Sequence, residues 1–134
     1  MIGVVDTSAL IRVFIPNGPL PDDFDEFLRG IERDRNIAIA PELLLAEVAN
    51  VINQKRKSKE LSDDESDQLL SDVLSVPIRI FPHQPIIRKA FEMAREHNLT
   101  VYDTLFLALA EVHGAVIFSA DRKVLNAASR LRLR

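Results

Sequence analysis

Four acidic residues stand where the folding pattern gives no simple reason for a charge: Asp6, Glu47, Asp103 and Asp121. Asp6 ends the apolar run 2–5, which is uniform enough to be a fully buried strand. Asp121 comes shortly after a second apolar run, 116–118. Either acid alone is explained as well by helix capping as by chemistry, because a carboxylate readily accepts hydrogen bonds from the first turn of a helix.

The other two acids belong to helical patterns. Asp103 precedes the most apolar stretch of the chain, 105–110, and a helix cap is again a sufficient explanation. Glu47 lies in PELLLAEVANVI, at the edge of the apolar face of a helix, from which it reaches either solvent or a site.

Taken together, the four acids predict a metal site. The carboxyl ends of parallel strands share one edge of a sheet, so Asp6, Asp103 and Asp121 converge there, and Glu47 can face them from its helix. Two carboxylates about 4–5 Å apart repel by roughly 3–4 kcal/mol at an effective dielectric near 20. Only oxygen ligands are on offer, which selects Mg²⁺ or Mn²⁺, and such ions activate water for attack at phosphorus. The residues predict metal-dependent hydrolysis of a phosphate or phosphodiester.

The elements that position these acids alternate along the chain. Short apolar runs predict strands over 2–5, 37–40, 78–81 and 116–118. Helical patterns cover 8–14, 21–34, 41–57, 62–76, 85–97, 105–110 and the residues from 121 onward. Leu131 and Leu133 alternate with arginines as a further edge strand. The predicted fold class is α/β, a three-layer α/β/α sandwich with a mostly parallel central sheet, in a single domain spanning 1–134.

Composition excludes several classes of protein. The 134 residues contain no cysteine, so disulfides, thiolate metal sites and a thiol nucleophile are absent. The net charge of −3 requires a polyanion to be held by local basic patches or by bound cations. Four scattered glycines form neither a Walker loop nor a dinucleotide-binding turn. The chain shows no signal peptide and no membrane span, and we expect a cytoplasmic protein.

In order, the stretches VVDTSAL, PELLLAEVANVI, VYDTLFLALA and FSADRKVL resemble the PIN domain, most closely the VapC-type toxin ribonucleases of type II toxin–antitoxin systems. The resemblance spans essentially the whole chain and implies a PIN-like fold. It implies that Asp6, Glu47, Asp103 and Asp121 hold Mg²⁺ or Mn²⁺ for RNA cleavage, with Asp6 and Asp103 as the nearest ligands. It also implies a homodimer and an antitoxin whose tail covers a groove near the first helices.

Further residues receive supporting roles. By the resemblance, Thr7 and Ser8 match the small polar residues after the first acid, and Ser119 would hydrogen-bond the last acid. Asn50, one turn beyond Glu47, would hold that carboxylate or touch substrate, and Arg122 would bind RNA phosphate beside Asp121. Thr104 stands where relatives often have alanine.

Other features are expected to be structural. The basic run 54–59 complements the dipole at a helix end or contacts RNA. We expect the three histidines, His83, His97 and His113, to be surface or structural residues, and the single tyrosine, Tyr102, to pack in the core rather than stack on a base.

Three other functions compete with the toxin. A PIN nuclease of RNA processing or quality control would share the acids, although the small size favours the toxin. A PIN fold without activity would be a binding module, and the four retained acids argue against it. A phosphoaspartate enzyme requires an acid at position 8, where Ser8 stands, and a receiver domain has no place for Glu47.

Overall fold

The computed structural model describes residues 1–131, with four strands gathered in one sheet. The strands are β1 (Ile2–Val5), β2 (Ile37–Pro41), β3 (Ile78–Phe81) and β4 (Val116–Phe118). Their order in the sheet is β3-β2-β1-β4, and every neighbouring pair runs parallel. The predicted strands are confirmed, with β2 one residue longer than expected.

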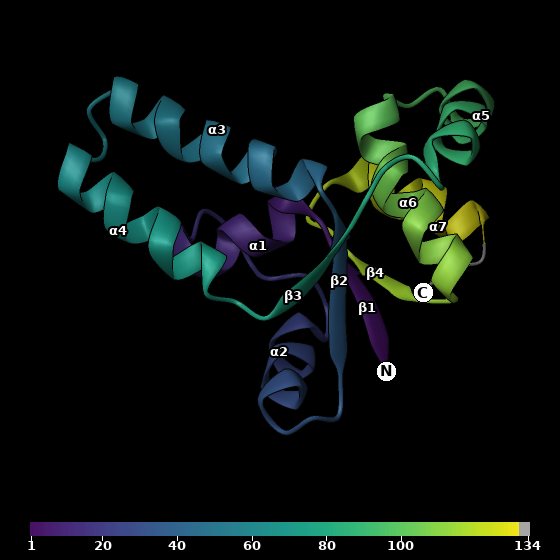
Figure 1. The fold of residues 1–134 in the computed structure, drawn as a ribbon, viewed down its shortest axis with the longest axis horizontal. Coiled ribbons are helices and arrows are strands. Elements are labelled where there is room, and N and C mark those ends of the chain that lie inside the picture. Colours follow the sequence, from purple (N-terminus) through teal and green to yellow (C-terminus); the bar gives the residue numbers. More distant parts are fainter. Residues whose placement is uncertain (132–134) are drawn as a thin grey trace.

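Seven helices of the described part surround this sheet (Figure 1). They are α1 (Thr7–Phe14), α2 (Phe24–Glu32), α3 (Leu43–Lys57), α4 (Asp63–Leu74), α5 (Ile87–His97), α6 (Val101–His113) and α7 (Arg122–Arg130). The chain steps from β1 to β2 to β3 in one direction and then returns across the sheet to β4. Because parallel crossovers are right-handed, this reversal puts α1–α4 on one side and α5–α7 on the other. The α/β/α sandwich is confirmed.

Helix α6 forms the core of one face. Residues 104–110 are buried without interruption, and the helix packs against β1, β2 and β4. Such a helix is apolar all round because it lies between the sheet and the outer helices.

On the opposite face, α2 packs two phenylalanines on β4. The ring centroids of Phe24 and Phe27 lie 5.1 and 4.6 Å from that of Phe118. Gly3 allows this approach, since a Cβ at position 3 would lie 2.7 Å from both Phe118 Cε2 and Phe27 Cζ. The strand β1 therefore needs its glycine for packing.

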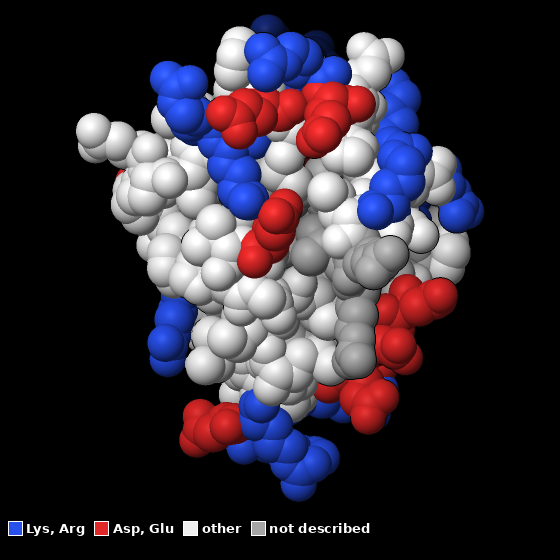
Figure 2. All heavy atoms as spheres, turned by 90° about the vertical axis from the view of Figure 1, so that its right-hand side faces the viewer, with Lys and Arg blue, Asp and Glu red and all other residues white. Residues whose placement is uncertain are grey.

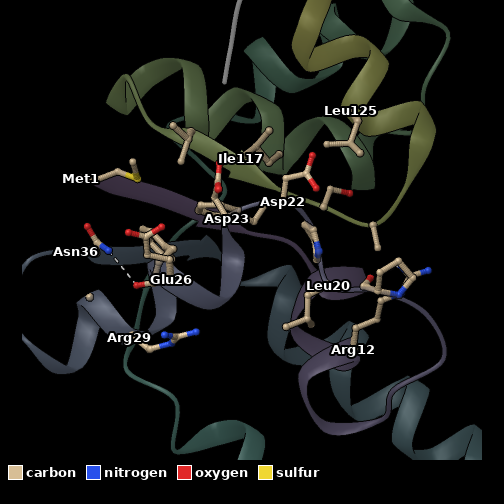
Figure 3. A pocket seen from close by; sticks show the side chains of 18 of the residues that line it. Met1, Arg12, Leu20, Asp22, Asp23, Glu26, Arg29, Asn36, Ile117 and Leu125 are labelled. Carbon is tan, nitrogen blue, oxygen red and sulfur yellow. Dashed lines mark hydrogen bonds between the residues drawn. The ribbon is translucent and has the colours of Figure 1, made fainter.

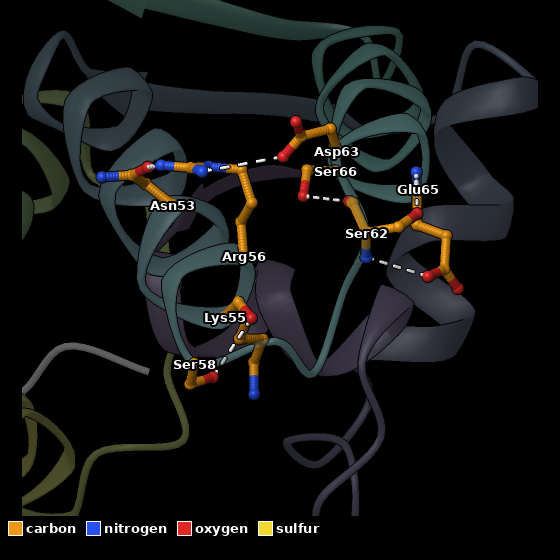
Figure 4. A network of polar contacts seen from close by, with 8 residues as sticks. All are labelled: Asn53, Lys55, Arg56, Ser58, Ser62, Asp63, Glu65 and Ser66. Carbon is orange, nitrogen blue, oxygen red and sulfur yellow. Dashed lines mark hydrogen bonds and ion pairs between the residues drawn. The ribbon is translucent and has the colours of Figure 1, made fainter.

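The hairpin of α3 and α4 is fixed by polar contacts at its tip (Figure 4). Ser62 and Glu65 form a capping box at the start of α4. Arg56 pairs with Asp63 at 3.6 Å, and Lys55 pairs with Glu60 at 3.1 Å. These partners support the prediction that the basic run 54–59 serves the end of a helix.

Three details differ from the sequence prediction. Helix α6 begins at Val101 rather than after Asp103, because Thr100 is its cap and accepts a hydrogen bond from the Asp103 N–H at 3.1 Å. Tyr102 is 62% exposed, so the prediction of core packing is wrong; the earlier helix start puts Tyr102 on an outward-facing first turn. Leu131 ends α7 as its C-cap residue, and Leu133 of the proposed edge strand lies outside the described residues.

The structural role of the histidines is supported for two of them. Nε2 of His83 accepts a hydrogen bond from the N–H of Leu43 at 2.9 Å, which fixes the start of α3. The ring of His113 packs edge-on against Phe81, with centroids 4.8 Å apart. Over residues 1–131, every helix is too short or too polar to cross a membrane.

Candidate active site

All four predicted acids line one cleft at the carboxyl edge of the sheet. Its volume is about 440 Å³, and its walls come from α1, α3, α6 and the start of α7. The lining side chains that carry charge or hydrogen-bonding groups are Asp6, Thr7, Ser8, Arg12, Asn17, Glu47, Asp103 and Asp121. The topology explains the location, because the order in which the chain adds strands reverses between β1 and β4. This reversal leaves a crevice at the carboxyl ends of the two parallel strands.

Asp6 is the most deeply placed of the acids, with 6% of its surface exposed. It is the N-cap of α1, and its Oδ1 accepts hydrogen bonds from the N–H of Ala9 at 3.0 Å and from the hydroxyl of Ser8 at 2.7 Å. The capping explanation is therefore correct for Asp6. Both capping hydrogen bonds are accepted by the same carboxylate oxygen, Oδ1.

Glu47 enters the cleft from the first half of α3. Its Oε1 accepts a hydrogen bond of 2.6 Å from the hydroxyl of Thr7. Thr7 directly follows Asp6, so two acids 41 residues apart are tied to one point of the backbone. The half-buried Glu47 points into the site rather than to open solvent.

Asp103 and Asp121 complete the cleft from two helix starts. Asp103 lies in the first turn of α6, where it is not the cap, and Asp121 is the N-cap of α7. The Asp121 Oδ1 accepts a hydrogen bond from the Lys123 N–H at 2.9 Å. The positive ends of these two helices favour negative charge at the cleft.

Ser8 and Ser119 join the ends of β1 and β4 beneath the acids. The Ser8 hydroxyl accepts a hydrogen bond from the N–H of Ala120 at 2.9 Å and lies 3.4 Å from the hydroxyl of Ser119. The Ser119 hydroxyl accepts one from the N–H of Asp121 at 3.0 Å. The two serines position the backbone on which Asp6 and Asp121 are carried.

The acids interact with one another electrostatically. Burial is the main cause that raises the pKa of Asp6, of Glu47 and of Asp103. The charge of Asp121 further raises the pKa values of Asp6 and Asp103, and that of Asp103 raises the pKa of Glu47. Hydroxyls oppose these shifts, from Ser119 and Ser8 at Asp6, Thr7 at Glu47 and Thr100 at Asp103. The cleft therefore holds carboxylates that a cation would stabilise.

The donor set fits a hard divalent cation in chemistry, since carboxylate oxygens of four side chains face one cleft. Across residues 1–131, no three His, Cys, Asp or Glu side chains are gathered tightly enough to form a ready ligand cluster. Metal binding at Asp6, Glu47, Asp103 and Asp121 therefore stays a prediction, and it requires the side chains to move toward the ion.

Two of the predicted supporting residues lie away from this cleft. Asn50 is exposed on α3 and does not line the cleft. Arg122 lines a larger neighbouring cavity, while the next residue, Lys123, is the cation whose charge lowers the pKa of Asp103. The predicted contact of Asn50 with Glu47 or with substrate, and that of Arg122 with RNA phosphate, stay predictions.

Arg12 and Asn17 line the cleft and were missed by the sequence analysis. Arg12 lies four residues after Ser8 on α1, so helical spacing puts both on one face and was the available signal. Asn17 belongs to the Pro16–Pro19 break, where no helical or strand periodicity indicates which way a side chain points. Thr104, by contrast, is buried at the base of α6, and its hydroxyl donates to the carbonyl of Ala90 at 2.7 Å.

This arrangement defines a class of protein: a parallel α/β sandwich with four acids at the switch point of its sheet. Residues 3–130 match the PIN domain, and the chain belongs to that family. The predicted family is confirmed.

Named relatives are VapC proteins. The chain is 28% identical to ribonuclease VapC3 of Pyrobaculum aerophilum over 128 residues, which covers 90% of each chain. It is 31% identical to ribonuclease VapC12 of Mycobacterium tuberculosis over 121 residues, 90% of this chain and 88% of that one.

Solved structures share the fold. The crystal structure of PAE2754 from Pyrobaculum aerophilum superposes with a TM-score of 0.71 at 22% identity, over 95% of this chain and 79% of that one. VapBC2 from Rickettsia felis, bound to a DNA fragment from its promoter, gives a TM-score of 0.62 at 19% identity, over 87% and 86%.

Proposed function

We propose that this protein is a Mg²⁺- or Mn²⁺-dependent endoribonuclease that hydrolyses RNA phosphodiester bonds, and that it is the toxin of a toxin–antitoxin pair. The observation that carries the proposal is the convergence of Asp6, Glu47, Asp103 and Asp121 on one cleft. Membership of the PIN family and similarity to proteins named VapC ribonucleases support the choice of RNA as substrate.

The chain's own residues have separable tasks in this reaction. Asp6 and Asp103 would hold the ion, and Glu47 and Asp121 would bind it directly or orient the attacking water. A bound Mg²⁺ or Mn²⁺ neutralises phosphate charge and lowers the pKa of a coordinated water. Thr7, Ser8 and Ser119 hold the carboxylates and the backbone so that the site needs little reorganisation.

The proposed partners are an RNA substrate, a second copy of this chain and an antitoxin. The antitoxin is supported by the fold shared with a toxin–antitoxin complex from Klebsiella pneumoniae, with a TM-score of 0.54 at 17% identity over 86% of this chain and 82% of that one. The homodimer is supported by exposed apolar side chains on α5 and α6: Ile87, Phe91, Tyr102 and Val112. Figure 2 views the side of these helices, where uncharged surface is interrupted by an acidic side chain and flanked by charged groups. We propose that the protein acts in the cytoplasm.

The test compares the purified, partner-free protein with Asp6→Asn and Asp103→Asn on structured RNAs in Mg²⁺ or Mn²⁺. We expect the wild type to cleave, both variants to lose at least about 100-fold in rate because a metal ligand is lost, and chelator to stop the reaction. Asp67→Asn on the exposed face of α4 is the matched control and should cleave normally. Cleavage by the variants at the wild-type rate would refute the mechanism.

The alternatives give different outcomes in the same experiment. A catalytically silent PIN binding module would bind RNA or protein and leave every RNA uncut in either metal. A processing or quality-control nuclease would cleave, but its production in cells would not arrest growth. Growth arrest that Asp103→Asn abolishes would distinguish the toxin.

A further inference from the structure

A second, larger cavity adjoins the acidic cleft (Figure 3). Its volume is about 1110 Å³, and it lies between the α1–α2 connection, α2, β4 and the start of α7. Arg12 and Ala120 line both the cavity and the cleft, so the two hollows meet at these residues. In Figure 3, Arg12 and Leu125 mark one end of the cavity, and Met1, Asn36 and Arg29 mark the other. The volume exceeds the roughly 300–1,000 Å³ of small-molecule pockets, which favours an extended ligand.

The charge of this cavity is opposite to that of the whole chain. Its lining contains five arginines, Arg12, Arg29, Arg33, Arg35 and Arg122, against three carboxylates, Asp22, Asp23 and Glu26. Arg29 is paired with Asp25, and over residues 1–131 the other four arginines have no carboxylate at ion-pair distance. A surplus of guanidinium groups in a chain of net charge −3 is a local patch that favours a polyanion.

Arg12 is fixed at the junction of the two hollows. Its Nη1 donates to the carbonyl of Pro19 at 2.9 Å, and its guanidinium packs on Gly18, where a Cβ would lie 3.1 Å from Cζ. Four carboxylates line the same cleft, yet none of them pairs with Arg12. The guanidinium is therefore held by the loop while other N–H groups stay available, which suits a phosphate at the mouth of the cleft.

The remaining wall is apolar. The half-buried Leu20 and Leu125 contribute to it beside the planar guanidinium groups, and the almost fully buried Phe27 and Ile117 lie behind. Alternation of cationic and apolar surface suits single-stranded RNA, whose backbone binds arginine and whose bases contact apolar or planar groups.

We propose that this cavity binds the single-stranded RNA segment on one side of the bond that is cut, and that Arg12 and Arg122 contact its phosphates. This proposal rests on the proposed ribonuclease function, because it assigns the cavity to that enzyme's substrate. It treats Asp22, at the centre of the cavity in Figure 3, as a group that opposes RNA binding.

Binding can be measured without cleavage in the Asp103→Asn background, using a short fluorescein-labelled single-stranded RNA of mixed sequence. Adding Arg12→Gln or Arg122→Gln should raise Kd several-fold. Each should also reduce the slope of log K against log salt by about 0.7, the value for one lost phosphate contact to a single strand. Arg79→Gln on β3, at the opposite edge of the sheet, should leave Kd and slope unchanged. Arg122 is exposed, so its substitution tests the cavity even if Arg12→Gln does not fold.

The sign of one further change separates RNA from a basic peptide of a protein partner. Asp22→Asn should lower the Kd for RNA, whereas it would raise the Kd for a basic peptide. The proposal is overturned if Kd and salt slope are unchanged in both arginine variants. It is also overturned if these variants lose binding to a basic peptide while their RNA binding stays intact. If the wild type cleaves no RNA, the proposed function fails. In that case RNA binding that depends on the two arginines would still assign the cavity to RNA, and RNA binding that does not depend on them would overturn this assignment.

Discussion

Thr7 Oγ1 donates a hydrogen bond of 2.6 Å to Glu47 Oε1, and this contact joins the end of β1 to α3. Thr7 directly follows Asp6, so one turn of backbone positions the deepest acid and holds a second acid from another element. The edge of the sheet fixes the Asp6 carboxylate, and the hydrogen bond from Thr7 holds the Glu47 carboxylate relative to it. Catalytic groups supported in this way need little rearrangement when a ligand binds.

Thr7→Val should therefore impair metal binding. The hydroxyl lowers the pKa of Glu47 and orients it, so its loss leaves a half-buried carboxylate that ionises less readily. Loss of such an outer partner typically costs 10–100-fold in metal affinity, and we expect about that reduction for Mn²⁺. Calorimetric titration with Mn²⁺ measures the effect. Thr7→Ser, which keeps the hydroxyl, is the control, and equal affinity in Thr7→Val and wild type would contradict the assigned role.

Ser8→Ala should reduce the stability of the protein as well as disturb the site. The substitution removes the acceptor of the Ala120 N–H and a donor to Asp6 Oδ1. A part-buried N–H left without its partner costs about 1–3 kcal/mol in the free energy of unfolding. Urea unfolding measures this loss. Ser71→Ala on α4, whose hydroxyl bonds a carbonyl within its own helix, should change stability far less.

Asp6→Asn should stabilise the metal-free protein at neutral pH. The pKa of Asp6 is raised in the folded state, so the folded protein binds this proton more tightly than the unfolded chain. Stability therefore falls as pH rises from the ordinary pKa of 3.8 through the raised value, and it remains lower above that value. Glu47 and Asp103 contribute in the same direction.

Thermal unfolding in chelator measures the pH effect of Asp6→Asn. The variant should have the higher Tm at pH 7, and the difference should vanish below the ordinary pKa, where both side chains are neutral. Asp67→Asn should leave Tm unchanged across this range. A wild type more stable than Asp6→Asn at pH 7 in chelator would contradict the expectation.

The sequence predicted the strands well because their apolar runs are uniform, and the alternation of strands and helices is enough to specify a parallel sheet. It also indicated the four acids, since strand ends and helix starts meet at one edge. The start of α6 was not predicted, because Thr100 and Asp103 are both good capping residues and only the folded backbone selects one. Tyr102 shows the same limit, because the direction of a side chain near a helix end depends on where that helix begins.

The last prediction concerns the packing beneath the site. Gly3→Ala places a Cβ 2.7 Å from Phe118 on β4 and from Phe27 on α2, so at least one of the two rings must shift. Overpacking of this kind costs about 1–3 kcal/mol, which chemical denaturation can measure. The double variant Gly3→Ala, Phe27→Leu should recover part of the loss, because a smaller side chain relieves the clash, and a double-mutant cycle gives the coupling between the two positions. Strict additivity would show that the clash is relieved elsewhere. Since Phe118 directly precedes Ser119, the single variant should also lower nuclease activity, and the double variant should recover part of the stability and part of the activity together.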